Sequence, residues 1–184
     1  MFFYSYILLW VLVIGLTFSN LLILRRIAPP VPRLDMDDVG LEDGMSPSTL
    51  KFETISGKTV DLVQSNKSGT LALYLAANCG ACSNVLADLH TYIKKHNDLS
   101  VVIFMQGESE HEIAHKVGDL LKIVPVVILS EDYKEIFRIS LFPFAYFLSP
   151  KGVVLAKGGV PAGNPHLELL THLALSENKK KMVS

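Results

Sequence analysis

The two cysteines of this chain stand three positions apart, shortly after an apolar run. Residues 70–76 carry no charged side chain and are typical of a strand that is buried on both faces of a sheet. Cys79 and Cys82 follow this run, and apolar residues then recur at helical spacing from Asn84 to His96. The sequence therefore places both thiols where a buried strand gives way to a helix.

The rest of the chain alternates strands and helices. Short apolar runs bounded by turn residues predict strands, and apolar positions that recur every three or four residues predict helices. We predict strands at 50–54, 59–62, 70–76, 100–105, 124–129, 144–148 and 153–157, and helices at 84–96, 110–121, 132–139 and 166–175. This order, ending in a hairpin and a helix, indicates an α/β fold with a mixed sheet flanked by helices.

The first 24 residues contain no Asp, Glu, Lys, Arg or His. As a helix, the stretch from Phe2 to Leu24 would span about 35 Å, which is enough to cross a hydrocarbon core about 30 Å thick. A cleaved signal peptide would carry basic residues before the apolar run, whereas here Arg25 and Arg26 follow it. We therefore predict one uncleaved transmembrane helix, an anchor at residues 1–26.

Length and composition allow one modest domain behind this anchor, in a chain of 184 residues. We expect a linker at 27–48 that contains the stiff stretch Pro29-Pro30-Val31-Pro32, a domain at 49–176 and a basic tail at 177–184. The net charge of −1 excludes a polycationic nucleic-acid binder. Two cysteines are also too few for a disulfide-stabilised secreted scaffold.

A Cys-x-x-Cys pair serves as half of a zinc site, as a loop for soft metals such as copper, or as a redox dithiol. A structural zinc site normally has four Cys or His ligands, and the chain has no second Cys-x-x-Cys pair. A position at the start of a helix favours the redox use, because the helix dipole would stabilise a thiolate at Cys79. Cys82, one turn further on, would then resolve a mixed disulfide. We expect no metal and no cofactor.

Three segments together resemble the thioredoxin superfamily, in particular membrane-anchored thioredoxin-like proteins of the TlpA and MauD type. They are the cysteine pair, the segment 142–148 with the turn 149–152 that follows it, and the terminal pattern that starts at His166. The resemblance covers roughly residues 50–174 and implies a thioredoxin-like fold. It also implies that Pro143 follows a cis peptide bond beside the dithiol, and that Phe142 and Pro143 bind the substrate backbone.

Three positions depart from the pattern of that family. Asn78 precedes the first cysteine, in a region where thioredoxins typically carry an aromatic residue. Leu73 and Val85 occupy the positions expected for the buried acid that assists proton transfer in many members. These departures favour a dedicated, partner-specific oxidoreductase over a general reductase.

Two other features compete with this interpretation. The segment from His111 to His115 matches the H-E-x-x-H motif of zinc proteases, with Glu112 as the general base. It lacks a third ligand at a suitable spacing, and its charged neighbours predict a solvated helix face. Pro125 also precedes an apolar strand, but it lies before the short helix rather than after it, so we do not expect it to be the cis-proline.

The resemblance implies a membrane-anchored protein thiol–disulfide oxidoreductase that forms or reshuffles disulfides during maturation of an extracytoplasmic protein. Its partners would be a client protein and a redox partner protein, with no nucleic acid. Family analogy places the domain outside the cell membrane, whereas Arg25, Arg26 and Arg33 favour the cytoplasm by the positive-inside rule. The alternatives are a copper-handling module that uses the same pair, a non-catalytic docking protein with this fold, and the zinc protease.

Overall fold

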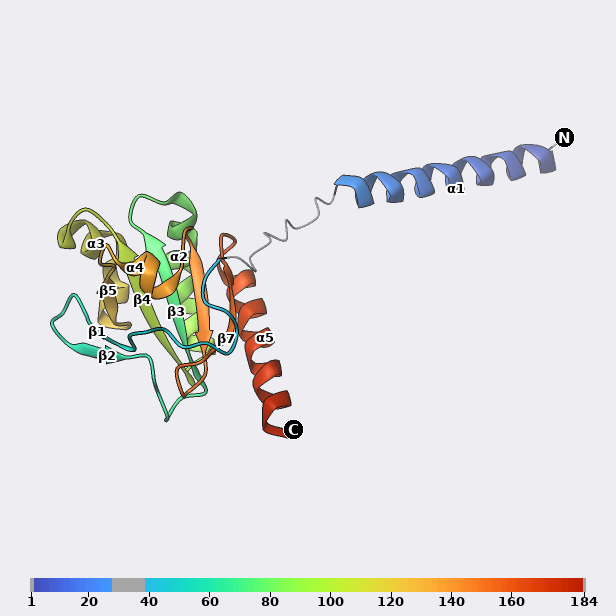
Figure 1. Ribbon diagram of the computed structural model, residues 1–184. Coiled ribbons are helices and arrows are strands. Elements are labelled where there is room, and N and C mark those ends of the chain that lie inside the picture. The colour runs from blue at the N-terminus through green and yellow to red at the C-terminus, as the bar shows by residue number, and fades with distance from the viewer. Residues whose placement is uncertain (1, 28–38, 184) are drawn as a thin grey trace. The chain divides into compact units, whose positions relative to one another are not determined.

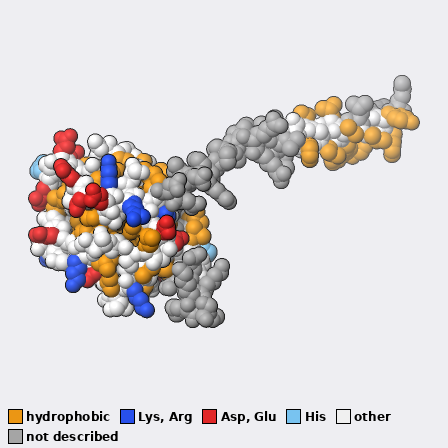
Figure 2. Space-filling view, viewed as in Figure 1, with side chains coloured by type: hydrophobic (Ala, Val, Ile, Leu, Met, Phe, Trp, Pro, Cys, Tyr) orange, Lys and Arg blue, Asp and Glu red, His pale blue; other side chains and the backbone are white. Residues whose placement is uncertain are grey.

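A computed structural model describes residues 2–27 and 39–183 of the chain. The chain divides into two units, Met1–Asp35 and Met36–Ser184. Helix α1 (Phe2–Ile27) belongs to the first unit, and the side chains described along it are exposed and largely apolar (Figure 2). Within the described ranges, no helix combines the length and the apolarity of a membrane span. Residues 28–38 of the expected linker lie outside these ranges.

The second unit is built on a five-stranded sheet in the order β5-β4-β3-β6-β7 (Figure 1). Its strands are β3 (Gly69–Ala76), β4 (Leu99–Gln106), β5 (Val126–Ile128), β6 (Phe144–Leu148) and β7 (Val154–Gly159). The strands β3, β4 and β5 run parallel, whereas β6 is antiparallel to both β3 and β7. A separate antiparallel hairpin is formed by β1 (Lys51–Glu53) and β2 (Thr59–Asp61). The mixed sheet confirms the predicted fold class.

Both faces of the sheet are covered. On one face, Leu71, Leu73 and Leu75 of β3 belong to a core with residues of α2 (Gly80–Lys95), α3 (Glu110–Val117) and α5 (Asn164–Val183). On the other face, Ala72 and Tyr74 belong to a core with residues of α4 (Tyr133–Phe137) and of the hairpin segment. The central strand therefore has no exposed side, which explains why its sequence is uncharged.

Two helix boundaries near the cysteines differ from those predicted. The helix α2 begins at Gly80, four residues before the predicted start, because its first turn contains small residues that add nothing to an apolar pattern. The helix α3 is shorter than predicted: Gly118 has a φ of 58°, which ends the α-helix, and the 3-10 helix η1 (Gly118–Lys122) continues the segment.

The structure also describes two segments that flank the expected domain. In the first, the backbone N–H of Leu41 donates to the hydroxyl of Tyr146 at 2.6 Å, and Gly44 and Met45 exchange backbone hydrogen bonds with Val154. This part of the expected linker is therefore bonded to the sheet. At the other end, α5 continues through residue 183, so most of the expected tail is helical.

Candidate active site

Cys79 caps the N-terminus of α2. Its backbone is extended (φ −98°, ψ 119°), and its Sγ accepts a hydrogen bond from the backbone N–H of Cys82 at 3.2 Å. The first turn of α2 carries no acidic side chain, so no charge in that turn opposes the positive end of the helix dipole. The position is therefore one at which backbone N–H groups would stabilise a thiolate.

Cys79 and Cys82 form a disulfide, with Cα atoms 5.3 Å apart. The two sulfur atoms differ in their surroundings. Cys79 is partly exposed, whereas Cys82 is 0% exposed and its Sγ lies 3.5 Å from the backbone nitrogen of Ala76. An incoming thiolate can therefore reach the first sulfur but not the second, which fits an attacking and a resolving cysteine.

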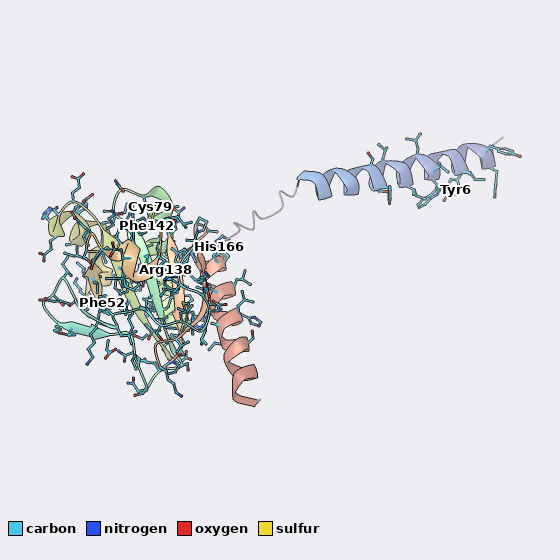
Figure 3. All side chains as sticks on the ribbon, viewed as in Figure 1. Tyr6, Phe52, Cys79, Arg138, Phe142 and His166 are labelled. Atoms are coloured by element: carbon cyan, nitrogen blue, oxygen red, sulfur yellow. A yellow bond between two sulfur atoms is a disulfide. The ribbon has the colours of Figure 1, made fainter. Side chains whose placement is uncertain are left out.

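The loop that precedes β6 lies beside the disulfide. The Phe142–Pro143 peptide bond is cis, as the resemblance implied, and it is the only cis bond among the residues that the structure describes. Sγ of Cys79 lies 4.0 Å from the carbonyl oxygen of Phe142, and Figure 3 shows both residues at the same end of the sheet. The Phe142 ring is partly exposed and packs near Tyr133, with ring centroids 5.8 Å apart. The structure thus brings the predicted site residues together.

The departures from the family pattern shape the surroundings of the pair. Asn78 is exposed next to Cys79. Leu73 and Val85 are fully buried, and both lie in the apolar cluster that contains Cys82. Neither of these two positions therefore supplies a proton acceptor to the buried sulfur.

Sequence reasoning missed two polar residues beside the pair. The hydroxyl of Ser83 donates to the carbonyl of Cys79 at 3.4 Å, and Nζ of Lys116 donates to Oγ of Ser83 at 2.8 Å. The parallel strands β3 and β4 end in register at Ala76 and Gln106, so α2 and α3 both start from the same sheet edge. The spacing of Cys79 and Ser83 in a helix could have indicated the first contact. No sequence pattern indicated the second, because it depends on how α3 packs.

The H-E-x-x-H segment forms part of a solvated helix surface, as expected. His111 and His115 are exposed, and a carboxylate oxygen of Glu112 accepts a hydrogen bond from the backbone N–H of Glu108 at 2.8 Å. The N–H of Glu112 donates to Oγ of Ser109 at 3.1 Å, so these side chains cap the start of α3. In the part of the chain that the structure describes, no three His, Cys, Asp or Glu side chains gather as metal ligands.

Several ionisable groups of the core have displaced pKa values. Burial raises the pKa of Tyr92 to about 12, although its hydrogen bond with Thr171 acts in the opposite direction. Burial also raises the pKa of Tyr146 to about 12. The pKa of Tyr74 is raised well above its usual range by burial and then by the nearby Tyr146. Because these pKa values are raised by folding, the three tyrosines should make the domain less stable at alkaline pH.

Comparisons with known proteins agree with this geometry, although no protein-family model matches the chain. The chain is similar to the methylamine utilization protein MauD of Methylorubrum extorquens, with 28% identity over 178 residues, covering 90% of this chain and 83% of that protein. It is also similar to the thioredoxin domain of a thiol–disulfide oxidoreductase from Bacteroides vulgatus, with a TM-score of 0.58, 17% identity and coverage of 71% and 99%. For StoA from Bacillus subtilis the TM-score is 0.56, with 17% identity and coverage of 68% and 97%.

The solved structures establish the fold, and the similarity to MauD confirms the resemblance predicted from the sequence. The disulfide of Cys79 and Cys82 lies at the junction between the end of β3 and the start of α2. The chain therefore has the thioredoxin-like fold of thiol–disulfide oxidoreductases, with its Cys79–Cys82 pair at the start of α2.

Proposed function

We propose that the chain is a thiol–disulfide oxidoreductase that acts on a protein partner. The observation that carries this proposal is the asymmetry of the disulfide, in which Cys79 is partly exposed at a helix N-terminus and Cys82 is buried. The similarity to MauD and to the oxidoreductase domain from Bacteroides vulgatus supports it.

The proposed chemistry transfers two electrons and two protons. A client thiolate attacks Sγ of Cys79, so that a client–Cys79 bond forms, the Cys79–Cys82 bond breaks and Cys82 leaves as a thiolate. A second client thiolate then attacks the client sulfur of this mixed disulfide, and Cys79 leaves as a thiolate. The client is oxidised by two electrons and the pair is reduced by two, while the two protons of the client thiols pass to the cysteines. The reverse sequence reduces a client disulfide.

In this proposal, Phe142 and Pro143 form the surface on which the client segment lies. The carbonyl of Phe142 is an acceptor for a backbone N–H of the client, 4.0 Å from the reacting sulfur. The partly exposed ring of Phe142 adds apolar contact area beside it. A segment seated here would bring its own sulfur close to Cys79.

We also propose a location for the reaction. Residues 1–26 would anchor the protein in the cell membrane as a single span, followed by the linker at 27–48, the thioredoxin-like domain at 49–176 and the basic tail at 177–184. The support for the anchor is the charge-free run in the sequence. The domain would act outside the cytoplasm, on a protein that acquires or rearranges disulfides there, because such compartments allow disulfides to persist.

A redox titration of the full chain tests the activity. The protein is equilibrated with glutathione or dithiothreitol buffers, and the free thiols are trapped and counted. We expect a reversible two-electron couple that Cys79→Ser abolishes. A potential between about −180 and −120 mV would assign client oxidation, and one near about −250 mV or below would assign client reduction. A chain without a reversible couple would overturn the proposal, and tight Cu(I) binding by its reduced pair would then identify the copper-handling alternative.

Membrane fractionation tests the location separately. We expect the full chain to stay with membranes during alkaline extraction and to be released by detergent, whereas a chain without residues 1–26 is found in the soluble fraction. A membrane-impermeant thiol reagent should label the reduced Cys79 in intact spheroplasts. Labelling only after lysis would place the domain in the cytoplasm, as the arginine count suggests.

A further inference from the structure

We propose that Lys116 is a positioning residue for the redox reaction, and that its ammonium group, held at the first turn of α2 by Ser83, stabilises the thiolate form of Cys79. This inference rests on the proposed function, because it concerns the reduced state of the same pair.

Two hydrogen bonds connect Lys116 with Cys79. Nζ of Lys116 donates to Oγ of Ser83 at 2.8 Å, and the same hydroxyl donates to the carbonyl of Cys79 at 3.4 Å. Ser83 lies one helical turn after Cys79, so its hydroxyl belongs to the same end of α2 as the reacting sulfur. A cation from α3 is thereby attached to the turn that carries the redox pair.

The charge of Lys116 is not cancelled by an acidic partner. The ion pairs between described residues do not include it. The nearest acids in sequence are engaged elsewhere: Asp119 pairs with Lys122 at 2.8 Å, and Glu112 accepts the N–H of Glu108. Lys116 is also partly buried, which reduces the screening of its field by solvent. Its partner, the hydroxyl of Ser83, is neutral.

This cation acts differently on the two redox states. The disulfide carries no charge, so Lys116 and the helix dipole do not stabilise it. After reduction, a thiolate at Cys79 interacts favourably with both. Lys116 therefore shifts the equilibrium towards the reduced pair and makes Cys79 a better leaving group in the second exchange step. Leu73 and Val85 are apolar, so neither position supplies a buried acid that could assist the pair, and Lys116 is then the charged group connected to its helix turn.

Other ionisable groups on the elements around the pair could also change the reactivity of Cys79 as the pH changes, so the test must separate their effects from that of Lys116. The loop 141–143 carries none. On the remaining elements they are Asp88, His90, Tyr92, Lys94 and Lys95 of α2, Glu108 before α3, Glu110, His111, Glu112 and His115 of α3, Asp119 and Lys122 of η1, Asp132, Tyr133, Lys134, Glu135 and Arg138 at α4, and His166, Glu168 and His172 of α5. His90, Lys116 and Asp119 line, together with Ser83, a groove of about 340 Å³. Lys116 is the member of this groove with a hydrogen bond to the first turn of α2.

The test measures the reactivity and the redox equilibrium of Cys79 in the full-length Lys116→Met variant. This substitution removes the charge but keeps a long side chain. Iodoacetamide alkylation of Cys79 in a Cys82→Ser background, followed across pH, should show a raised apparent pKa. The rate below that pKa should fall about threefold, in line with a partly exposed charge near a helix terminus. The equilibrium with glutathione should move about threefold towards the disulfide, which is about 14 mV to more negative potential at 29.6 mV per tenfold change.

Four comparisons separate this role from a structural one. Lys116→Arg keeps the charge, so its alkylation profile and its equilibrium with glutathione should match those of the parent chain. Lys94→Met removes the same charge from the last turn of α2 and should leave the profile unchanged. Ser83→Ala removes the hydroxyl that holds Lys116, so it should shift the pH profile of alkylation in the same direction as Lys116→Met. About 1 M salt should reduce the difference between the parent chain and Lys116→Met, because it screens charge but not packing.

Equal profiles for the parent chain and Lys116→Met, with the redox couple intact, would overturn the inference and leave the proposed function standing. Equal shifts in Lys116→Met and Lys94→Met would also overturn it, because net charge would then explain the effect. A parent chain without a couple would overturn the proposed function instead. Thermal unfolding checks that each variant folds, and Lys116→Gln replaces the Met variant if that one does not.

Discussion

The carbonyl oxygen of Phe142 lies 4.0 Å from Sγ of Cys79, although the two residues are 63 positions apart in the sequence. On its other side, the same sulfur accepts the backbone N–H of Cys82 at 3.2 Å. The reacting atom therefore has a hydrogen-bond donor on the side of the helix and an acceptor on the side of the loop. In the proposed function, the donor would stabilise the thiolate and the acceptor would hold the backbone of a client.

Phe142→Ala should separate binding of a client from the chemistry of the pair. Loss of the partly exposed ring removes apolar contact area, so we expect exchange with a protein client to slow by about threefold to tenfold, or about 1 kcal/mol. Exchange with dithiothreitol should change little, because a small dithiol does not use that area. The measurement is the rate of disulfide exchange with each reagent. An equal loss with both would contradict a role for Phe142 in client binding.

For two buried tyrosines on one face of the sheet, loss of the hydroxyl should have different effects on the free energy of unfolding. The hydroxyl of Tyr146 accepts from Leu41 and donates to the carbonyl of Phe137, both at 2.6 Å. Tyr146→Phe leaves both buried groups unpaired and should cost about 1–3 kcal/mol. The hydroxyl of Tyr74 is buried and has no hydrogen-bond partner among the described residues, so Tyr74→Phe should be neutral or stabilising. Urea unfolding of both variants checks this order, and the reverse order would contradict it.

Alkaline pH should destabilise the domain through Tyr92. Its pKa is about 12 in the folded protein and about 10 in the unfolded chain. Between these values the unfolded chain binds fewer protons, so the contribution is fully present below about pH 10 and is lost as pH rises towards 12. The free energy of unfolding of Tyr92→Phe should therefore fall less steeply over this range. Identical slopes for the two proteins would show that Tyr92 does not contribute.

The start of α3 offers a test of the zinc-protease alternative. Ser109→Ala and Glu112→Ala should each destabilise the fold by about 0.5–2 kcal/mol, because each removes a capping hydrogen bond. His111→Ala should change neither stability nor disulfide exchange, since that side chain is exposed. Thermal unfolding and the redox titration measure both effects. Hydrolysis of a peptide substrate that is lost in His111→Ala would instead support the protease.

Local patterns in the sequence predicted most of the elements that position the site. β6 occurs at the predicted residues, and the strand before the cysteines is β3 with one added residue. Predictions were less accurate where the deciding feature is a single backbone position or a small side chain. Gly118 ends α3 early through its positive φ, and the small residues after Cys79 hide the true start of α2.

The sequence by itself determined the pair of sulfurs, their position at a strand-to-helix junction and the apolar period of the elements around them, because these depend on residues that are close along the chain. The cis bond before Pro143 came from resemblance to a family rather than from local residues. Only the tertiary structure decided that the carbonyl of Phe142 meets Cys79 and that Lys116 meets Ser83. Those contacts depend on strand order and helix packing, which bring together segments that no local pattern connects.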